Sequence, residues 1–136
     1  MNIEALGEAI AFLREHPYTY LATVEEGVPW VRPMVTSRID DSGAIWYPTR
    51  ISTTKVRQVR ENPHVCIAAY HQGVYLRIFG RAEVVDDKVM KLQLWDENWT
   101  AYFAGVDDPE YVLLKVTPER VELGRQLGAV ATESPR

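Results

Sequence analysis

Three short turns that end in glycine constrain the fold of this chain more than any other feature. They are Glu25-Glu26-Gly27, Asp40-Asp41-Ser42-Gly43 and His71-Gln72-Gly73, and each lies between segments rich in β-branched and aromatic residues. Strands joined by turns this short pair antiparallel. The sequence therefore predicts a mainly β protein assembled from consecutive hairpins.

Six segments have the residue pattern of strands, namely 18–24, 28–39, 44–48, 65–70, 74–85 and 111–123. Six short strands are best closed into a small barrel, because closure removes exposed sheet edges. Pro29 and Pro33 cannot donate to a ladder, so the second strand is expected at an edge or with a bulge. We expect it to pair with the third strand through the turn at 40–43, which would bring Arg32 toward Thr49.

Helices are expected around this barrel. An apolar stripe that includes Ile3 and Leu13 predicts an amphipathic helix over residues 2–15. The other two helices are expected at 55–61 and 90–95, with N-caps at Ser52 or Thr53 and at Asp86 or Asp87. No repeat or linker divides the sequence, so residues 1–136 are expected to form one domain, with 124–136 as a flexible tail.

Composition and charge narrow the range of partners. The chain has 136 residues, of which 46% are hydrophobic and 25% charged, and its formal net charge is −4. This balance is typical of globular proteins and gives no electrostatic reason to expect nucleic acid or a membrane as a partner. The N-terminus lacks the features of a secretory signal, and Cys66 is the only cysteine. We therefore expect a cytoplasmic location, a buried and inert thiol, and no metal site.

A strand, a polar loop and a helix start over residues 45–56 are the first indication of chemistry. A helix N-terminus presents unpaired N–H groups and a partial positive charge. Ser52, Thr53 and Thr54 add hydroxyl groups there, and Lys55 adds a full charge in the first turn. Together these groups would form a receptor for phosphate. The alternative is an ordinary capped surface helix with a solvated lysine.

Arg32 is a second candidate ligand for an anion. It lies within the otherwise apolar strand segment Val31-Arg32-Pro33-Met34-Val35. Its side chain either lies along the barrel with the charge at the rim, or turns into the same pocket as Lys55. The expected pairing of the second and third strands would let the two cations converge.

Several motifs occur together in the order typical of a known family. They are Leu21-Ala22-Thr23-Val24, Pro29-Trp30-Val31-Arg32-Pro33-Met34, Ile45-Trp46-Tyr47-Pro48-Thr49, Thr53-Thr54-Lys55-Val56, Glu61-Asn62-Pro63-His64-Val65 and Arg77-Ile78-Phe79-Gly80-Arg81-Ala82-Glu83-Val84-Val85. Over residues 10–123 the chain resembles FMN-binding split barrels related to pyridoxamine 5'-phosphate oxidase, especially the general stress protein 26-like branch. The resemblance implies a six-stranded antiparallel split β-barrel with flanking helices.

The resemblance also implies roles for individual residues. The cofactor-binding positions of the family correspond to Arg32, Pro33, Met34, Val35, Thr49, Thr53, Thr54 and Lys55. Arg32, Lys55 and the two threonines before it match the phosphate ligands. Thr49 matches a polar position beside the flavin, and the backbone at 33–35 matches the segment along the isoalloxazine ring. In this family the second subunit completes each pocket, so a homodimer with FMN at the interface is implied.

The sequence departs from the true oxidase at several positions. Pro48 and Thr54 stand where the oxidase commonly has tyrosine and arginine, and Leu123-Gly124 replaces an aromatic pair. The arginine–histidine element that grips the pyridoxal substrate is missing from residues 125–129. Pyridoxamine phosphate oxidation is therefore not expected, and the sequence indicates no catalytic acid or base.

The function implied is hydride or electron transfer by FMN between a donor such as NAD(P)H and a small substrate of unknown identity. Two alternatives stay open. One is binding of the deazaflavin F420, for which Arg50 and Arg57 are candidate ligands, and the other is a non-catalytic flavin-binding stress-response module. An aromatic cluster either packs over the barrel end or forms a wall beside the flavin, and it consists of Trp95, Trp99, Tyr102 and Phe103.

Overall fold

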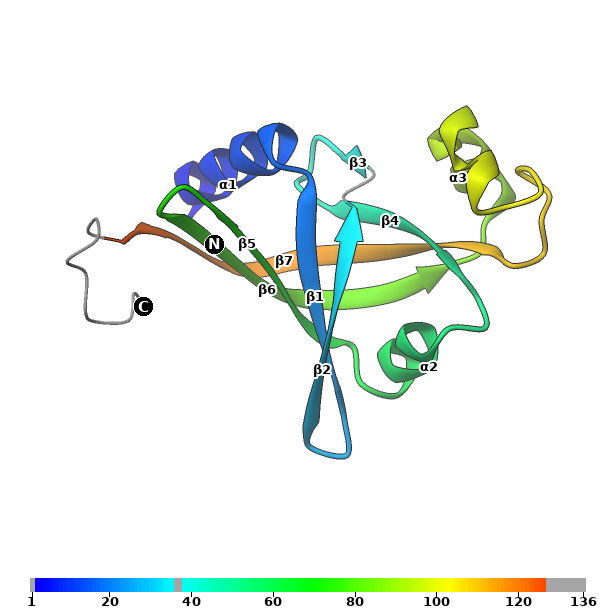
Figure 1. Cartoon of the computed structure of the whole chain (residues 1–136), viewed down its shortest axis with the longest axis horizontal. Coiled ribbons are helices and arrows are strands. Elements are labelled where there is room, and N and C mark those ends of the chain that lie inside the picture. Colours follow the sequence, from blue (N-terminus) through cyan, green and yellow to red (C-terminus); the bar gives the residue numbers. More distant parts are fainter. Residues whose placement is uncertain (1, 36–37, 127–136) are drawn as a thin grey trace.

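The computed structural model describes residues 2–35 and 38–126 (Figure 1). The helices are α1 (Ile3–Glu15), α2 (Thr54–Glu61), α3 (Lys88–Leu94) and the 3₁₀ helix η1 (Glu97–Ala101). The strands are β1 (Tyr18–Glu25), β2 (Val28–Val35), β3 (Arg38–Ile39), β4 (Ile45–Arg50), β5 (His64–His71), β6 (Val74–Val85) and β7 (Tyr111–Arg125). No helix formed by the described residues is long and apolar enough to cross a membrane.

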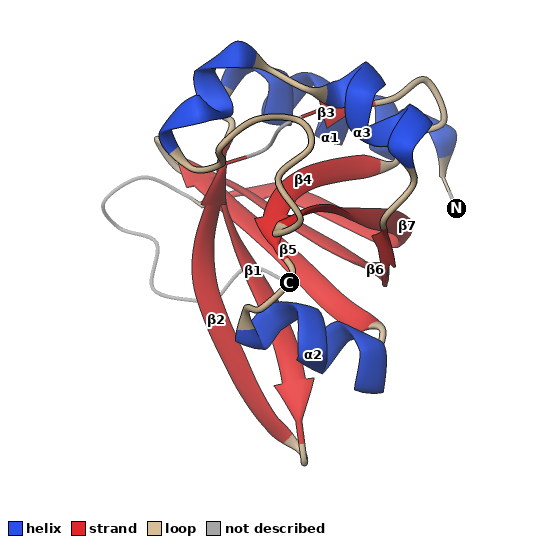
Figure 2. Ribbon diagram, turned by 90° about the vertical axis from the view of Figure 1, so that its right-hand side faces the viewer, coloured by secondary structure: helices blue, strands red, loops and turns tan. Residues whose placement is uncertain are grey.

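The strands form one antiparallel sheet in the order β2-β1-β5-β6-β7-β4-β3. The sheet curls, with α1 and α3 at one end and α2 at the other (Figure 2). The predicted class, a mainly β antiparallel barrel with flanking helices, is confirmed. The described residues contain seven strands rather than the six expected, because the predicted strand 28–39 is divided into β2 and β3.

The expected pairing of the second predicted strand with the third is wrong for β2. Among the described strands, β2 pairs only with β1, whereas β4 pairs with β3 and β7. The β1–β2 turn, in which Glu26 and Gly27 have φ values of 50° and 78°, pairs β2 with β1, whereas the turn at 40–43 pairs β4 only with the short β3. A two-residue turn of this kind matches the twist of two paired strands and fixes their register. β2 is consequently an edge strand, where Pro29 and Pro33 are tolerated.

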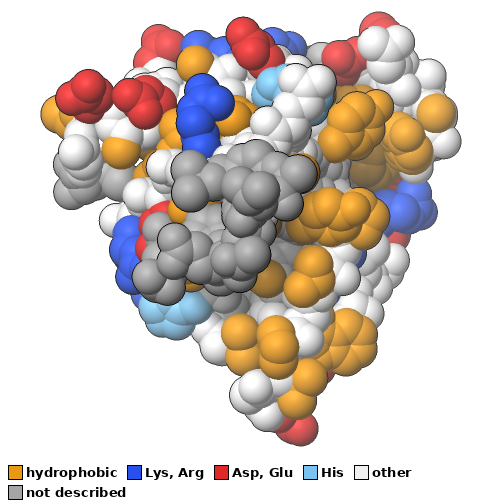
Figure 3. Space-filling model, turned by 60° about the vertical axis from the view of Figure 1, so that its left-hand side comes forward, with side chains coloured by type: hydrophobic (Ala, Val, Ile, Leu, Met, Phe, Trp, Pro, Cys, Tyr) orange, Lys and Arg blue, Asp and Glu red, His pale blue; other side chains and the backbone are white. Residues whose placement is uncertain are grey.

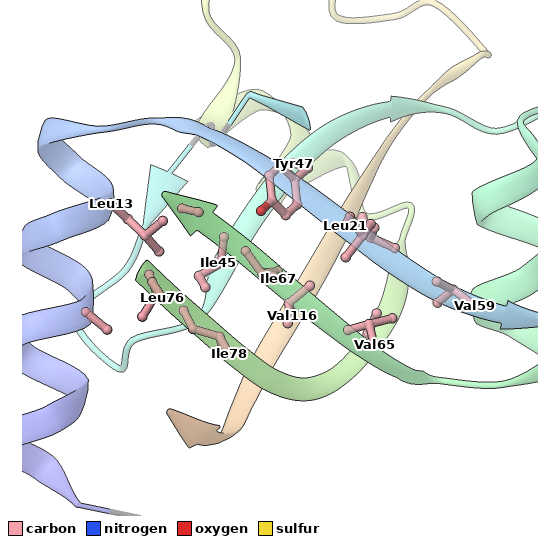
Figure 4. Packing of buried hydrophobic residues seen from close by; sticks show 14 residues of the cluster. Leu13, Leu21, Ile45, Tyr47, Val59, Val65, Ile67, Leu76, Ile78 and Val116 are labelled. Atoms are coloured by element: carbon pink, nitrogen blue, oxygen red, sulfur yellow. The ribbon is translucent and has the colours of Figure 1, made fainter. Parts of the chain in front are cut away.

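The main core lies inside the curled sheet (Figure 4). Its largest buried side chains come from different strands and include Leu21, Tyr47, Ile67, Ile78 and Leu114. Leu13 of α1 and Val59 of α2 join the same cluster. Burying one such side chain contributes about 1.5–3 kcal/mol. The cluster therefore holds the strands together and also anchors α2 to them.

β7 extends beyond the end expected for it. Gly124 and Arg125 pair with β6, so they are not part of a tail as the sequence suggested. Most of the predicted tail, residues 127–136, lies outside the described residues. Pro118 is accommodated opposite Gly80, where the β6–β7 register shifts.

Cys66 is half-buried in β5, rather than fully buried as expected. Burial, opposed in part by the charge of Arg77, raises the pKa of its thiol. A thiol with a raised pKa is mostly protonated at neutral pH and is a weak nucleophile. The expectation of an inert cysteine therefore agrees with its electrostatic surroundings.

Gly80 is expected to tolerate no side chain. A Cβ atom there would lie 2.5 Å from the backbone oxygen of Thr117 and 3.2 Å from Cγ1 of Val116. Gly80→Ala should therefore lower the free energy of unfolding by about 1–3 kcal/mol, measured by denaturant titration. Gly7→Ala on α1, where the new Cβ meets open space, should instead raise it by about 1 kcal/mol. Equal effects of the two substitutions would contradict the close approach of β6 and β7.

Candidate anion-binding site at the start of α2

Arg32 lies on the inner face of β2, toward the core. Its register partner on β1 is Leu21, and Trp30 is opposite Thr23. Leu21 and Thr23 are fully buried, and alternate residues of a strand share one face of the sheet. The tight β1–β2 turn, which sets this register, therefore decides that Arg32 faces inward.

Four neutral oxygen atoms hold the guanidinium group of Arg32. Nη1 donates to Thr23 Oγ1 at 2.8 Å, and to the carbonyl oxygens of Leu21 at 3.2 Å and Trp30 at 3.4 Å. Nη2 donates to Oε1 of Gln58 at 2.8 Å. Burial lowers the pKa of Arg32, as expected for a cation partly removed from water. The guanidinium group is thus fixed in place. Because its four partners are neutral, they do not compensate its positive charge.

Lys55 is half-buried near Arg32. Burial, and after it the charge of Arg32, lowers the pKa of the Lys55 ammonium group. The charge of Arg32 therefore acts on Lys55, which α2 and not a β2–β4 pairing brings toward the β1–β2 hairpin. Joint binding of one anion by the two cations stays a prediction. In the described part of the chain, neither side chain forms an ion pair with a carboxylate. Partly desolvated cations are unfavourable unless an anion joins them.

The N-terminus of α2 has no side-chain cap. Thr53 is the N-cap residue, but its side chain accepts no hydrogen bond from the helix, and its Oγ1 donates to the Arg50 carbonyl oxygen at 2.8 Å. Arg57 N–H reaches the Thr53 carbonyl oxygen only at 3.5 Å. Ser52 is engaged elsewhere, since its Oγ donates to Glu110 at 2.5 Å. The first N–H groups of α2 can therefore bind an anion, whereas the Ser52 hydroxyl is already occupied.

Thr49 lies in the half of β4 that has an open edge. β7 pairs with all of β4, whereas β3 pairs only with Ile45 and Trp46. The Thr49 side chain is 4% exposed, and its Oγ1 has no hydrogen-bond partner among the described residues. An unpaired buried hydroxyl is costly. Contact of Thr49 with a ligand stays a prediction, which the open edge and the unpaired hydroxyl make reasonable.

Pro33, Met34 and Val35 form the last part of β2. Pro33 and Val35 are exposed, Met34 packs against the main core, and the Met34 carbonyl oxygen accepts a hydrogen bond from Thr19 Oγ1 at 3.4 Å. Because β2 is an edge strand, one side of its backbone pairs with no described strand. The free side of this backbone is accessible to a planar ligand. Contact of residues 33–35 with the isoalloxazine ring stays a prediction.

A second group of cations surrounds a depression of about 310 Å³ beside α2. Arg57 and Arg60 line it together with the carboxylate of Glu61 and with Thr54, and Lys55 does not. Arg57 is paired with Glu25 at 2.9 Å, whereas Arg60 has no ion-pair partner within residues 2–35 and 38–126. We expected Ser52, Thr53, Thr54 and Lys55 to form one receptor, but of these four Lys55 does not border the depression. The depression is therefore a competing location for a phosphate group.

Two buried polar residues at this site were missed from the sequence. Gln58 and Thr23 are both 0% exposed, and they meet each other and Arg32. The sequence pattern of α2 placed only Val56 and Val59 toward the core, because a glutamine among charged residues is typical of a solvated helix face. Their contact depends on the placement of α2 against β1, which no local signal reveals.

The aromatic cluster near α3 forms a second core. The ring centroids of Trp95, Trp99 and Phe103 lie 5.3, 6.1 and 5.2 Å from that of Tyr111. The buried side chain of Trp46 belongs to the same cluster. The packing interpretation is therefore confirmed for these residues, whereas Tyr102 remains 69% exposed.

Comparison with known sequences assigns the chain to the family that its motifs resemble. The model of the pyridoxamine 5'-phosphate oxidase family matches residues 6–124. General stress protein 26 of Bacillus subtilis (strain 168) is 30% identical over 116 residues, which are 82% of this chain and 81% of that protein.

Solved structures with the same fold agree. A protein from Clostridium acetobutylicum related to general stress protein 26 has a TM-score of 0.79 and 25% identity, covering 92% of this chain and 91% of that one. The general stress FMN/FAD binding protein of Xanthomonas citri has a TM-score of 0.78 and 20% identity, covering 99% and 98%. The motifs, the curled sheet and these matches lead to one conclusion: the chain belongs to the pyridoxamine 5'-phosphate oxidase family, in its general stress protein 26-like branch.

Proposed function

We propose that this protein binds FMN through its phosphate group at Arg32, Lys55 and the first turn of α2, and that it acts as an FMN-dependent oxidoreductase. The observation that carries the proposal is a pair of partly desolvated cations without a carboxylate partner. A phosphate dianion would offset their desolvation through charge-assisted hydrogen bonds. The uncapped helix N-terminus adds a favourable field for the same anion.

The relatives support a flavin as the ligand, since the Xanthomonas citri protein of the same fold is an FMN/FAD binding protein. FMN, when bound, supplies hydride- and electron-transfer chemistry between a donor such as NAD(P)H and a small substrate. The chain supplies the phosphate anchor. The open edges of β2 and β4, with Pro33–Val35 and Thr49, would orient the ring.

The charge pattern favours FMN over the deazaflavin F420. Arg50 and Arg57 were the candidate ligands for an acidic tail. Arg50 Nε lies 3.6 Å from a Glu110 oxygen, and Arg57 is held by Glu25 at 2.9 Å. Because both charges already have carboxylate partners, they are less available to a second acidic group.

The end of β7 supports a substrate other than the pyridoxal compounds. Gly124 stands where the oxidase has an aromatic residue, and the ring and hydroxyl of Tyr75 occupy the space into which a side chain at 124 would project. A bulky residue at 124 would therefore displace Tyr75. The aromatic residue that the oxidase has at this position would therefore not fit in this chain without movement of Tyr75.

We further propose a homodimer formed through an outer hydrophobic face. This face consists of Tyr18, Tyr20, Val31, Val35 and Tyr70, which are 77, 55, 64, 55 and 61% exposed. The β1–β2 and β1–β5 registers place all of them on the side opposite Arg32. Figure 3 shows hydrophobic side chains along one side of the molecule down to the tip of the β1–β2 hairpin. Exposed aromatic and aliphatic side chains gathered in this way are typical of an interface.

Lys55→Ala is expected to weaken FMN binding by about 1.5–3 kcal/mol, the range for a lost hydrogen bond to a charged group. Binding of riboflavin, which lacks the phosphate, should hardly change. Titration of cofactor-free protein followed by flavin fluorescence measures both affinities. Lys88→Ala removes the same charge from the exposed start of α3 and serves as the control. Unchanged FMN affinity in Lys55→Ala would contradict the phosphate assignment.

NADH or NADPH is expected to bleach the visible absorption of the protein loaded with FMN when oxygen is excluded, because hydride transfer reduces the flavin. Readmitting oxygen should restore the colour. The measurement is an anaerobic absorption titration with each nucleotide. Bound FMN that neither nucleotide reduces would contradict NAD(P)H as the donor and favour the non-catalytic flavin-binding module.

Val31→Glu is expected to convert the homodimer into a monomer, because it places a charge in the centre of the outer hydrophobic face. Sedimentation equilibrium with and without FMN measures the change. Val89→Glu, at an exposed position of α3, introduces the same charge outside this face and should leave the dimer intact. A wild-type protein that binds FMN as a monomer would refute the proposed interface.

A further inference from the structure

Gln58 is a buried amide placed between two opposite charges. Its Oε1 accepts hydrogen bonds from Arg32 Nη2 at 2.8 Å and from Thr23 Oγ1 at 2.5 Å. Its Nε2 donates to Oε1 of Glu25 at 3.5 Å. The side chain is 0% exposed, so water does not compete for these contacts. One end of the amide thus faces a guanidinium group, and the other end faces a carboxylate.

Glu25 is the carboxylate that this amide keeps away from Arg32. Its other oxygen accepts a hydrogen bond from Arg57 at 2.9 Å. The hydrogen bond from Arg57, opposed by burial and helped by Gln58, holds the pKa of Glu25 below its usual value. The carboxylate is therefore charged at neutral pH. A carboxylate in direct contact with Arg32 would neutralise the cation and compete with any anionic ligand.

A neutral amide and a carboxylate differ in the net charge that they give to a group formed with Arg32. The Gln58 oxygen orients the guanidinium group together with Thr23 Oγ1 and the carbonyl oxygens of Leu21 and Trp30. It adds no negative charge, so the positive charge of Arg32 remains available. Arg57 and the Gln58 amide nitrogen together satisfy Glu25 on the other side.

We propose that Gln58 is a positioning residue for anion recognition, which orients Arg32 with a neutral oxygen and separates it from Glu25, so that the charge of Arg32 is directed to the phosphate of the ligand. This inference rests on the proposed function. It assigns the specificity for a phosphorylated flavin to a residue that does not itself contact the phosphate.

Gln58→Glu tests the proposal, because it keeps the shape of the side chain and replaces the neutral acceptor with a charged one. The measurement is the ratio of FMN affinity to riboflavin affinity, together with the thermal midpoint of unfolding. The ratio is expected to fall by about tenfold or more, the effect of one charge-assisted hydrogen bond lost to a competing carboxylate. Riboflavin affinity should be retained. Gln93→Glu, exposed on α3, adds the same charge elsewhere and should leave the ratio unchanged.

Thr23→Val is a second variant that adds no charge. It removes one neutral acceptor of Arg32 and the hydroxyl that donates to Gln58, so the ratio should again fall, by several-fold, with riboflavin affinity retained. A merely structural role for Gln58 would lower the FMN and riboflavin affinities together and leave their ratio unchanged, whatever happens to the thermal midpoint, and that result would overturn the proposal. An unchanged ratio in both variants would overturn it as well.

The wild-type protein separates this inference from the proposed function. If it binds FMN no more tightly than riboflavin, the phosphate site itself is refuted, and the role of Gln58 is refuted with it. If the wild type prefers FMN, Lys55→Ala abolishes that preference, and Gln58→Glu retains it, the phosphate site stands and only the role of Gln58 is refuted.

Discussion

Arg32 and Lys55 are partly buried cations whose charges act on each other, and neither forms an ion pair with a carboxylate of the described residues. Each has a lowered pKa, and Arg32 contributes to the shift of Lys55. Such an arrangement is unfavourable in isolation, and the fold maintains it by using neutral acceptors on β1 and α2 to hold the guanidinium group. The rest of the proposed site follows from this constraint, since an anion such as the proposed phosphate group would remove the repulsion.

The positions of Arg32, Gln58 and Lys55 are fixed by the β1–β2 hairpin and by the packing of α2. The two-residue turn after β1 sets the register of β2 and directs Arg32 inward. Val59 anchors α2 to the core and Val56 is buried on the same helix, and this packing places Gln58 against the β1–β2 hairpin. The Arg57–Glu25 ion pair makes a further link between α2 and the end of β1. The proposed binding of the cofactor therefore depends on the packing of α2 and of the β1–β2 hairpin, including residues that would not contact the cofactor.

Much of the fold could be predicted because its signals are local. Glycine turns and alternating apolar residues gave the hairpins, and motif order gave the family. The β2–β4 pairing was predicted wrongly because a strand with two possible neighbours carries no local signal for the choice. Arg32 and Lys55 were identified by their charge in an unusual setting. Gln58 was not, since a polar residue on a short helix has the pattern of an exposed one until its tertiary partner is known.

A crystal structure of the protein with FMN bound would show which of the two cationic locations beside α2 holds the phosphate group. We expect the phosphate oxygens to lie within hydrogen-bond distance of Lys55 Nζ and of Arg32 or the first N–H groups of α2. A phosphate group in the depression lined by Arg57 and Arg60, without contact to Arg32 or Lys55, would contradict the proposed site.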